Sequence, residues 1–391
     1  MSEAPPSNAE RGAPRLLTRE FLLLLGAVSF FGFSWSFYLI LPKFFAAELG
    51  MDAAAIGRAV AIEGVTAVAV TPLVGWLVDR YGRRPWLIFG NLMLALTGTL
   101  YLFVDHEGPL LYLAQMCWGV GMVMGFNSAG TMTADIAPSD RMAQALGLFG
   151  AANLGMNAVS PTIAEILAGS VGWKYVFAAS AASGLVAAIL ATRLTEPPRH
   201  QPHEHEPRRP IFGRPLLVVY GTTILMTAAF TALFTLHQPF ALEMGVTEVR
   251  SFFIGFAIVA LTVRLGGGRL IDRVGVLRAS VVALVLYSVV PPMLGLLGPE
   301  HLFEIGAMMG FGHGIAYPAL TALGIERADA QSRGMVVSII HGAFNGGHAF
   351  FAFALGWVAA QWDYGTSFWI AGGLTLAGAF LIGMGTHNKS T

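Results

Sequence analysis

Charged residues are scarce in this sequence. Asp, Glu, Lys and Arg make up 12% of its 391 residues, whereas hydrophobic residues make up 55%. A water-soluble chain carries about 25% charged residues on average, so most of this surface must face something other than water. Together with a mean hydropathy of +0.64, the shortage of charge indicates a protein that lies in a lipid membrane.

Other absences exclude further classes of protein. The 23 basic residues balance the 23 acidic ones, and no basic stripe with interleaved aromatic residues is present to hold nucleic-acid phosphates. The single Cys117 forms no intrachain disulfide and lies in an apolar run, where a thiol acts as a small hydrophobic side chain. No nucleophile with its base, metal-ligand spacing or phosphate loop is visible. We therefore expect no enzyme activity, no cofactor, no metal and no nucleic-acid partner.

Long apolar runs are what the sequence has in abundance. A helix that crosses a bilayer needs about 20 mostly apolar residues, and twelve such runs are separated by polar breaks. We predict an all-α membrane protein with twelve transmembrane helices. The predicted spans are 21–42, 53–78, 85–104, 110–135, 141–168, 173–193, 215–242, 252–272, 277–297, 301–327, 332–360 and 366–386.

One longer polar break, residues 194–214, divides these spans six to six and is rich in Pro and His. We predict that it is a cytoplasmic linker between two six-helix bundles, residues 21–193 and 215–386, and that residues 1–20 and 387–391 are tails. Its His200, His203 and His205 suggest a transition-metal site, but without a fold to fix them we expect a solvated linker.

The positive residues predict the orientation, because Lys and Arg near membrane spans remain on the cytoplasmic side. With both termini in the cytoplasm, only Lys43, Arg58, Lys174 and Arg250 fall on the outer side, and Arg264 falls within a span. All the other Lys and Arg residues then lie inside. We therefore predict a multi-pass protein of the inner (plasma) membrane.

The two halves carry the same residues at a nearly constant offset, which is the repeat plan of one class of transporter. Gly75, Leu77, Asp79, Arg80 and Gly82 recur as Gly268, Leu270, Asp272, Arg273 and Gly275. Arg141, Gly150, Asn153 and Phe177 recur as Arg333, Gly342, Asn345 and Phe368.

The run Gly75-Trp-Leu-Val-Asp79-Arg80-Tyr-Gly82-Arg83-Arg84-Pro85 lies between the second and third predicted spans. It resembles the signature loop of the major facilitator superfamily, G-x-L-x-D-R-x-G-R-R. The eighth and tenth spans resemble the bacterial drug and metabolite efflux branches, through Arg264-x-x-x-Gly268-x-Leu270-x-Asp272-Arg273-x-Gly275 and Gly314-x-x-Tyr317-Pro318. The fifth span departs from the antiporter-type motif, since Ser160, Ala164 and Glu165 stand where it has glycines.

The resemblance implies that the signature loop forms a cytoplasmic gate. We expect the Asp79 carboxylate to lie against the positive N-terminus of a helix in the other half, near Ser332. Positive-inside anchoring is the alternative role for the arginines. The predicted gate residues are Gly75, Asp79, Arg80, Gly82, Arg83, Arg84, Asp272 and Arg273.

Two charged residues lie at membrane depth, where such residues are costly and often functional. Glu63, near the middle of its span, either carries a proton during transport or makes a structural hydrogen bond. Arg264 either pairs with a polar group, such as Asn153 or Asn157, or binds an anionic group of the substrate. We favour the structural pairing for Arg264.

The resemblance also implies a central cavity between the first, fourth, seventh and tenth spans. Aromatic, mostly uncharged walls suit a small amphipathic organic molecule, although packing between helices is an equal alternative for each aromatic or Met side chain. The expected lining is Trp35, Tyr38, Met124, Asn127, Phe234, His237, Gln238, His313 and Tyr317.

The eleventh span carries a polar stripe. Ser338, His341, Asn345 and His348 fall on one helical face, so this face must meet another helix or the cavity, where we place Asn345. Histidine changes charge near physiological pH, so His341 or His348 either assists or replaces Glu63 as the proton carrier. The alternative is a set of hydrogen bonds between helices.

We therefore predict a secondary transporter that moves a small amphipathic organic solute by alternating access and exports it in exchange for protons. Proton-linked uptake of a small monocarboxylate is the alternative within transport. A transceptor that keeps the fold without transport is the alternative outside it. The expected partners are a small-molecule substrate, protons and membrane lipid, and we expect a monomer.

Cysteine labelling tests the predicted orientation. In a Cys117→Ala background, His203→Cys lies in the predicted cytoplasmic linker, and its thiol should resist an impermeant thiol reagent in intact cells. Glu248→Cys lies in a predicted outer loop and should react with the same reagent. The reverse labelling pattern would contradict the orientation.

Overall fold

The computed structural model describes residues 16–138, 141–196, 211–266, 273–329 and 332–385. Every regular element in these ranges is a helix. The helices of the N-terminal half are α1 (Arg19–Ser36), η1 (Phe37–Ile40), α2 (Leu41–Ala47), α3 (Ala53–Tyr81), α4 (Arg84–Tyr101), α5 (Pro109–Ile136), α6 (Met142–Ser170) and α7 (Trp173–Ala191). The helices of the C-terminal half are α8 (Arg214–Thr231), η3 (Ala232–Leu236), α9 (His237–Glu243), α10 (Arg250–Gly266), α12 (Val276–Ser288), α13 (Val290–Leu297), η4 (Pro299–His301), α14 (Leu302–Arg327), α15 (Arg333–Gln361) and α16 (Tyr364–Met384).

Local sequence accounts for where several helices begin. Asp52 and Asp363 are the N-cap residues of α3 and α16, and their carboxylates accept hydrogen bonds of 2.7 Å from the backbone N–H groups of Ala55 and Thr366. Helices α5 and α8 instead carry a proline in their first turn, where its missing N–H costs nothing. The helix ends therefore fall within a few residues of most predicted span ends.

Three predicted spans, 21–42, 215–242 and 277–297, are interrupted helices. The first changes from α1 to η1 and then to α2, which has Pro42 in its first turn. The second changes from α8 to α9 through η3, a five-residue π-helix. The third breaks between Ser288 and Val290, just before Pro291 and Pro292, because proline cannot donate the backbone hydrogen bond that a continuous helix needs.

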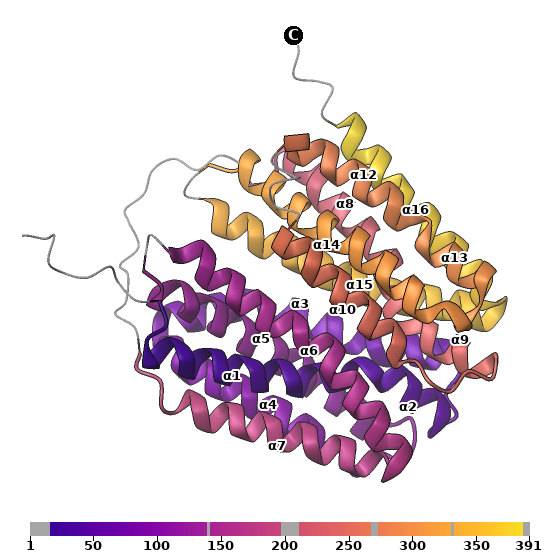
Figure 1. Ribbon diagram of the computed structural model, residues 1–391, viewed down its shortest axis with the longest axis horizontal. Helices are drawn as coiled ribbons and strands as arrows, with labels where there is room; N and C mark the ends of the chain where they lie inside the picture. Colours follow the sequence, from indigo (N-terminus) through magenta and orange to yellow (C-terminus); the bar gives the residue numbers. More distant parts are fainter. Residues whose placement is uncertain (1–15, 139–140, 197–210, 267–272, 330–331, 386–391) are drawn as a thin grey trace, which may run out of the picture.

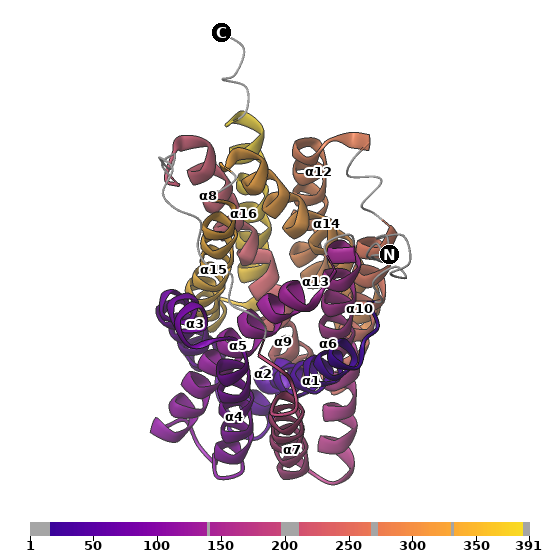
Figure 2. The ribbon, with the colours of Figure 1, turned by 90° about the vertical axis from the view of Figure 1, so that its left-hand side faces the viewer.

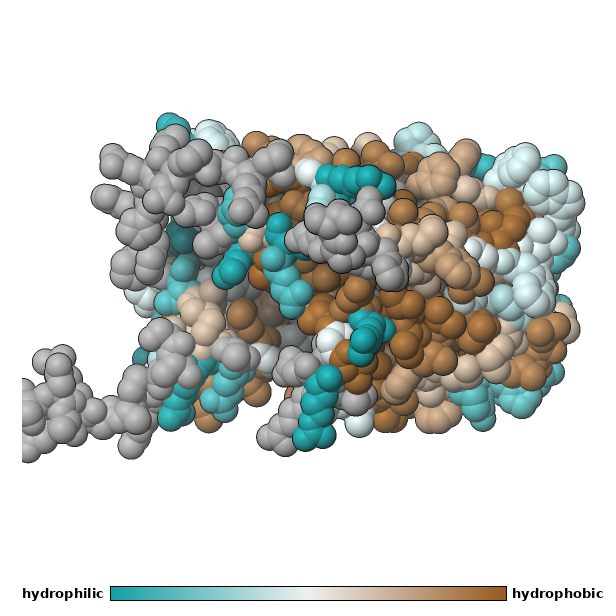
Figure 3. Space-filling view, turned by 90° about the horizontal axis from the view of Figure 1, so that it is seen from above, coloured by the Kyte–Doolittle hydropathy of each residue, from teal (hydrophilic) through white to brown (hydrophobic). Residues whose placement is uncertain are grey.

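Eight of the described helical stretches are long and apolar enough to cross a membrane by length and composition. They correspond to α1 with α2, α3, α5, α7, α8 with α9, α12 with α13, α15 and α16. Figure 3 shows apolar side chains gathered along the middle of the visible face, with more polar side chains toward its two ends. This is the surface expected of a protein whose middle faces lipid.

The two halves of the chain lie side by side. In Figures 1 and 2 the N-terminal helices, in indigo to magenta, lie below the C-terminal helices, in orange to yellow. Helix α3 packs along α15, and α6 packs along α10. These two helix pairs form most of the boundary between the halves.

The sequence repeat is visible in how each half packs. In the N-terminal half, Phe177 of α7 meets Phe44 edge-to-face, with ring centroids 4.9 Å apart. In the C-terminal half its counterpart Phe368 of α16 meets Phe240 edge-to-face at 5.3 Å. In both halves an aromatic residue after the break in the first helix therefore packs on the last helix.

Glycines let particular helices approach closely. A Cβ on Gly306 of α14 would overlap the carbonyl oxygen of Phe252 in α10, and a Cβ on Gly255 of α10 would overlap that of Phe303 in α14. Along the boundary between the halves, Gly57 of α3 faces α15 in the same way. Small residues of this kind bring membrane helices into backbone contact.

Gly306→Ala tests the α10–α14 contact. The added methyl group has no room, so the helices must separate and the melting temperature of the purified protein should fall by several degrees. Gly373→Ala in α16 is the matched control, because nothing lies within 4 Å of the position its Cβ would take. That change should leave the melting temperature unchanged or raise it, since Ala favours a helix by about 1 kcal/mol over Gly. Equal melting temperatures for the two variants would show that the contact does not limit stability.

Candidate functional site

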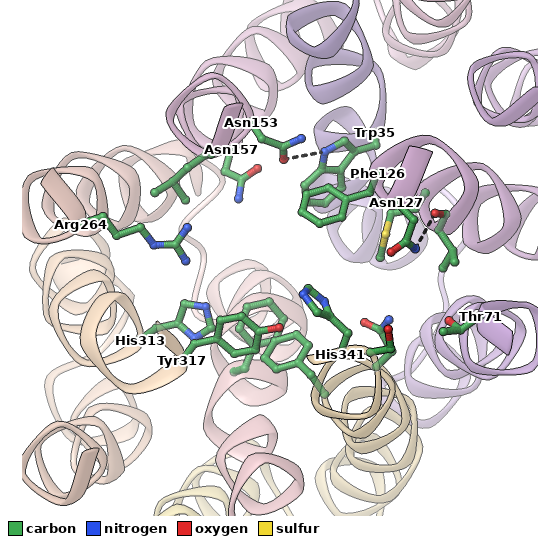
Figure 4. A pocket seen from close by; sticks show the side chains of 18 of the residues that line it. Trp35, Thr71, Phe126, Asn127, Asn153, Asn157, Arg264, His313, Tyr317 and His341 are labelled. Carbon is green, nitrogen blue, oxygen red and sulfur yellow. Dashed lines mark hydrogen bonds between the residues drawn. The ribbon is translucent and has the colours of Figure 1, made fainter. Parts of the chain in front are cut away.

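A cavity of about 250 Å³ lies between the two halves. The N-terminal half lines it from α1, α3, α5 and α6, and the C-terminal half from α8, α10, α14 and α15 (Figure 4). The lining residues are Trp35, Thr71, Met122, Val123, Phe126, Asn127, Gly150, Asn153, Leu154, Asn157, Phe230, Phe256, Arg264, His313, Tyr317, Ser338, His341, Phe344 and Asn345. No Asp or Glu is among these described lining residues.

Amides from α6 form part of the N-terminal wall. The indole N–H of Trp35 donates to Asn153 Oδ1 at 3.3 Å, and the Ser36 hydroxyl donates to Asn157 Oδ1 at 3.0 Å. Both amide oxygens are thereby occupied. The Asn153 Nδ2 is buried and has no hydrogen-bond partner in the described chain. This wall therefore presents amide N–H donors.

The C-terminal wall is a set of packed rings. The His313 and Tyr317 rings, one turn apart on α14, stack at 5.8 Å with 19° between their planes. Phe344 of α15 meets Tyr317 edge-to-face at 5.2 Å and lies 4.9 Å from the Phe230 ring. His341 meets Tyr317 at 5.8 Å. These contacts hold a largely apolar surface of rings against the cavity.

Arg264 reaches this cavity from α10. In Figure 4 its guanidinium points inward, between Asn157 and His313. We expected it to pair with Asn153 or Asn157, but no hydrogen bond or ion pair joins its side chain to any described residue, and its side chain is exposed. The guanidinium therefore faces the cavity instead of being held within a packed interface.

The structure brings five of the predicted substrate-cavity residues to the cavity: Trp35, Asn127, His313, Tyr317 and Asn345. The other five, Tyr38, Met124, Phe234, His237 and Gln238, lie outside its lining.

Packing explains these departures. Tyr38 is buried against Tyr101, and its hydroxyl donates to the Leu94 carbonyl oxygen at 3.0 Å. Phe234 and His237 pack against Phe252, with the His237 ring stacked at 4.1 Å. Met124 is buried within the N-terminal half, in a cluster of apolar side chains from α3 and α5. All of these side chains fill space within one half.

The sequence-based lining also left out contributors. Phe126 and Phe344 face the cavity although neither was expected there. Gly150, Asn153 and Asn157 show that α6 supplies one wall, and Arg264 shows that α10 supplies another. The two asparagines lie four residues apart, so they share one face of their helix. That spacing was the signal available in the sequence.

The three candidate proton carriers lie in different surroundings. Glu63 of α3 is 6% exposed and lies outside the cavity lining, and its carboxylate has no hydrogen bond or ion pair within the described ranges. His341 lines the cavity. His348 shares a 2.8 Å hydrogen bond with the Thr231 hydroxyl of α8. Ser338 and Asn345 line the cavity with His341, so most of the stripe faces it.

Polar contacts close the boundary between the halves at one end. The Glu165 carboxylate of α6 accepts 2.8 Å hydrogen bonds from the backbone N–H groups of Val249 and Arg250, where α10 begins. The Lys43 ammonium donates to Glu165 Oε1 and to the Thr247 carbonyl oxygen. We call this set the Lys43–Glu165 seam. Its carboxylate is 4% exposed and lies at a helix N-terminus, where a negative charge is stabilised by up to about 2 kcal/mol.

Gln238 extends the seam. Its Nε2 donates to the Leu39 carbonyl oxygen at 2.8 Å, and its Oε1 accepts from the Lys43 backbone N–H at 3.1 Å. The side chain thus belongs to α9 but is bonded to the chain around η1 and α2. This explains why Gln238 lies outside the cavity that we expected it to line.

The signature loop is held within the N-terminal half. Gly82 has φ of +98°, which favours glycine, and the Glu196 carboxylate accepts from the backbone N–H groups of Arg83 and Arg84 at 2.6 and 2.9 Å. Arg83 Nε also lies 2.8 Å from Asp135 Oδ2. These contacts fix the turn between α3 and α4.

Other predicted gate residues differ from expectation. Gly75 lies inside α3 with open space beside it, so no tight turn or close approach requires it. Arg80 lies over the Trp76 ring, 5.5 Å from its centroid, and Arg273 is exposed. The Asp79 side chain and Asp272 lie outside the described residues, as do most of the 194–214 linker and the two tails. The expected contact between Asp79 and the start of α15 therefore stays a prediction.

Comparison with known proteins agrees with this geometry. The family model for the Major Facilitator Superfamily matches residues 22–330 and 255–389. Among curated proteins, the chain is 27% identical over 222 residues to Multidrug resistance protein 1 of Bacillus subtilis, covering 54% of this chain and 56% of that one. It is 25% identical to the multi-drug resistance efflux pump PmrA of Streptococcus pneumoniae, covering 68% and 70%.

A third relative is the purine ribonucleoside efflux pump NepI of Salmonella typhimurium, 23% identical over 52% of each chain. The match thus spans little more than half of the Bacillus and Salmonella relatives. Among solved structures, the nucleoside transporter NupG has a TM-score of 0.75 at 14% identity, covering 94% of this chain and 100% of that one. A D-xylose–proton symporter has a TM-score of 0.73 at 15% identity, covering 93% and 96%.

The solved structures show a shared fold, and the sequence relatives include bacterial drug efflux pumps, as the motifs in the eighth and tenth spans indicated. These matches indicate a transporter and not an enzyme. The chain belongs to the major facilitator superfamily.

Proposed function

We propose that this protein is a secondary active transporter of the inner (plasma) membrane that exports a small amphipathic organic solute in exchange for protons. The observation that carries the proposal is the cavity between the halves, which both halves line and which the Lys43–Glu165 seam closes off at one end. Alternating access needs such a site, because each half must keep its part of the binding surface while the halves rock.

The proposed architecture is two six-helix bundles, residues 21–193 and 215–386, joined by a cytoplasmic linker at 194–214 and flanked by cytoplasmic tails. The helix order and the aromatic contacts repeated between the halves support it. The charge distribution supports the orientation, since Lys43 and Arg250 of the predicted outer set meet in the seam. In this orientation the seam closes the cavity from the outer side, and the cavity is reached from the cytoplasmic side. We propose that the transporter acts as a monomer in lipid.

The lining supports a small amphipathic substrate. Rings from α5, α8, α10, α14 and α15 supply apolar area, and amides from α5, α6 and α15 supply a few polar groups. A pocket of this composition binds small organic molecules. The names of the relatives, drug and ribonucleoside efflux pumps, favour export as the direction.

Proton-linked uptake of a small monocarboxylate is the second candidate. It is favoured by one observation, the unpaired Arg264 in the cavity wall. Direction separates the two proposals, because export and uptake move the solute in opposite senses under the same proton gradient. A transceptor would bind a ligand but move none.

The first experiment is a thermal-shift screen of the purified full chain against drugs, nucleosides and small organic acids. A ligand that binds only the folded protein raises its melting temperature. Each hit is then tested for uptake into inside-out vesicles under an imposed pH gradient. Accumulation that collapses when the gradient is dissipated supports export. Binding without movement in either direction would overturn the transport proposal.

Glu63→Gln tests the proton-coupling role of the carboxylate. A carboxylate at this depth is costly without a partner, so we expect Glu63 to hold a proton while it is buried. We expect it to exchange that proton when the transporter exposes it to either side of the membrane. The variant should lose pH-driven accumulation of a screening hit in proteoliposomes but keep its binding affinity. Glu300→Gln, at an exposed carboxylate before α14, is the control and should keep both. Unchanged accumulation by Glu63→Gln would reject the role.

His341→Gln and His348→Gln extend the same measurement. If either histidine shares the proton, the pH profile of transport should shift in that variant alone. If both variants keep the parental profile and rate, the stripe on α15 serves hydrogen bonding and cavity shape.

Glu165→Gln tests the outer seam. The variant removes the negative charge that accepts hydrogen bonds from the Val249 and Arg250 N–H groups across the boundary. A hydrogen bond to a charged group is worth about 1.5–3 kcal/mol, and each 1.4 kcal/mol changes an equilibrium about tenfold, so the outer side should open more often. In a Cys117→Ala background, Met122→Cys places a thiol in the cavity wall. An impermeant reagent added outside intact cells should label it at least about tenfold faster with Glu165→Gln. Glu248→Gln, whose carboxylate is exposed, is the control. Equal labelling rates in both would show that the seam does not hold the outer side shut.

A further inference from the structure

We infer that the cavity binds an organic monoanion with a flat apolar body, and that Arg264 holds its anionic group opposite the amides of Asn153 and Asn157. This inference rests on the proposed transport function and names the substrate class. It assigns Arg264 a direct contact with the ligand, in place of the structural pairing expected from the sequence.

The first argument is charge. Arg264 is the one residue with a permanent charge among the described residues that line the cavity. The ion pairs of the described chain all join other residues, so no described carboxylate lies within ion-pairing distance of the Arg264 guanidinium. A cation at membrane depth is costly unless water or an anion meets it. The cavity is the place where a ligand's anion can do so.

The second argument is the donors across from Arg264. Trp35 occupies Asn153 Oδ1 and Ser36 occupies Asn157 Oδ1, so each asparagine is left with its amide N–H groups to offer. Asn153 is 7% exposed, and its Nδ2 has no partner in the described part of the chain. A buried donor without a partner calls for an explanation. A carboxylate bound between α6 and α10 meets the Asn157 amide beside Arg264, and a rotation of the Asn153 amide brings its buried Nδ2 to the same acceptor.

Figure 4 shows the same arrangement in space. Asn153 and Asn157 project from α6 toward the cavity, and the Arg264 guanidinium projects into it from the facing helix. Helices α6 and α10 pack against each other across the boundary between the halves. A ligand held by these three side chains therefore touches both halves, as a transported substrate must.

The third argument is the shape of the remaining wall. In Figure 4 the stacked His313 and Tyr317 rings lie beside Arg264. Phe344 packs on Tyr317, and Phe230 packs on Phe344, so these rings extend the apolar surface. Planar ligands pack well on aromatic faces. The cavity, at about 250 Å³, lies just below the range of about 300–1,000 Å³ typical of drug-sized ligands. A small ligand with its anionic group at one end fits this arrangement.

One cation also limits the ligand's charge. A second negative charge would be desolvated without a cationic partner among the described lining residues, and a ligand cation would be repelled by Arg264. Neutral molecules would gain only the aromatic contact. The lining thus selects a single negative charge.

The binding test uses three probes with the same ring system and similar size: 2-naphthoate, 2-naphthamide and 2-naphthylmethylamine. The purified full chain should bind the naphthoate at least about tenfold more tightly than the amide, because a hydrogen bond to a charged group is worth about 1.5–3 kcal/mol. The amine should bind weakest of the three. Equal affinities for the three probes would overturn the inference.

Arg264→Gln keeps a polar side chain and removes the charge. It should lose at least about tenfold in naphthoate affinity and leave naphthamide affinity unchanged. Arg58→Gln is the matched control, since Arg58 lies outside the cavity lining and is paired with Glu107 at 3.0 Å. It should leave all three affinities unchanged. If Arg264→Gln weakens the three probes equally and lowers the melting temperature, Arg264 is structural and the inference fails.

Asn157→Asp is the second variant, in case Arg264→Gln does not fold. It places a carboxylate across from Arg264, which should pair with the guanidinium and exclude the naphthoate while the melting temperature holds or rises. Naphthamide binding should survive. Undiminished naphthoate binding by this variant would place the anion elsewhere and overturn the inference.

Transport of the same probes separates this inference from the proposed function. If the naphthoate binds through Arg264 but is moved in neither direction by reconstituted protein, the transport proposal fails and the assignment of the anion site stands. If the protein moves the naphthamide as well as the naphthoate, transport stands and the selectivity inferred here fails.

Discussion

A polar group in the middle of a bilayer is stable only where it finds a partner or meets water, and this constraint governs the whole structure. Most polar side chains at depth satisfy it locally: Gln115 bridges the Tyr101 hydroxyl and the Ala59 carbonyl oxygen, and Ser34 joins α1 to Ser180 of α7. Arg264 and the Asn153 amide nitrogen, both from residues that line the cavity, do not satisfy it within the described residues. These two groups therefore mark the inferred ligand-binding site.

The same constraint shapes the boundary between the halves. At one end, Glu165 is almost fully buried, and it is stable there because Lys43 and the N-terminus of α10 surround it. Separating the halves at this end would take the α10 N–H groups away from the carboxylate and leave it with Lys43 of its own half. At the cavity, the walls carry aromatic rings and an amide N–H donor that has no hydrogen-bond partner among the described residues. At one end of the boundary the two halves bind each other, whereas the cavity in the interior offers groups that can bind a ligand.

Helix packing and helix breaks complete the arrangement. Glycines such as Gly306 bring α10 and α14 into backbone contact, which fixes Arg264 and His313 on adjacent helices. The breaks at η1 and η3 redirect the chain before the seam, so residues on either side of a break face different surroundings. Rigid packing within each half and polar contacts between them are what a rocking mechanism requires.

The sequence by itself determined the helical class, most helix boundaries and the family, because apolar run length and the signature loop depend on local composition. It also placed Trp35, Asn127, His313, Tyr317 and Asn345 at the cavity.

Only the tertiary structure decided the rest of the site. Tyr38 lies in η1, Phe234 lies in η3 and Gln238 follows it in α9, so regular helical spacing could not give their directions. Glu165 appeared in the sequence only as a departure from a glycine motif, and its meaning depends on Lys43 and Val249, which are far away in the chain. Whether Arg264 is paired or free depends on how α6 and α10 pack against each other, and the local sequence of neither helix determines that packing.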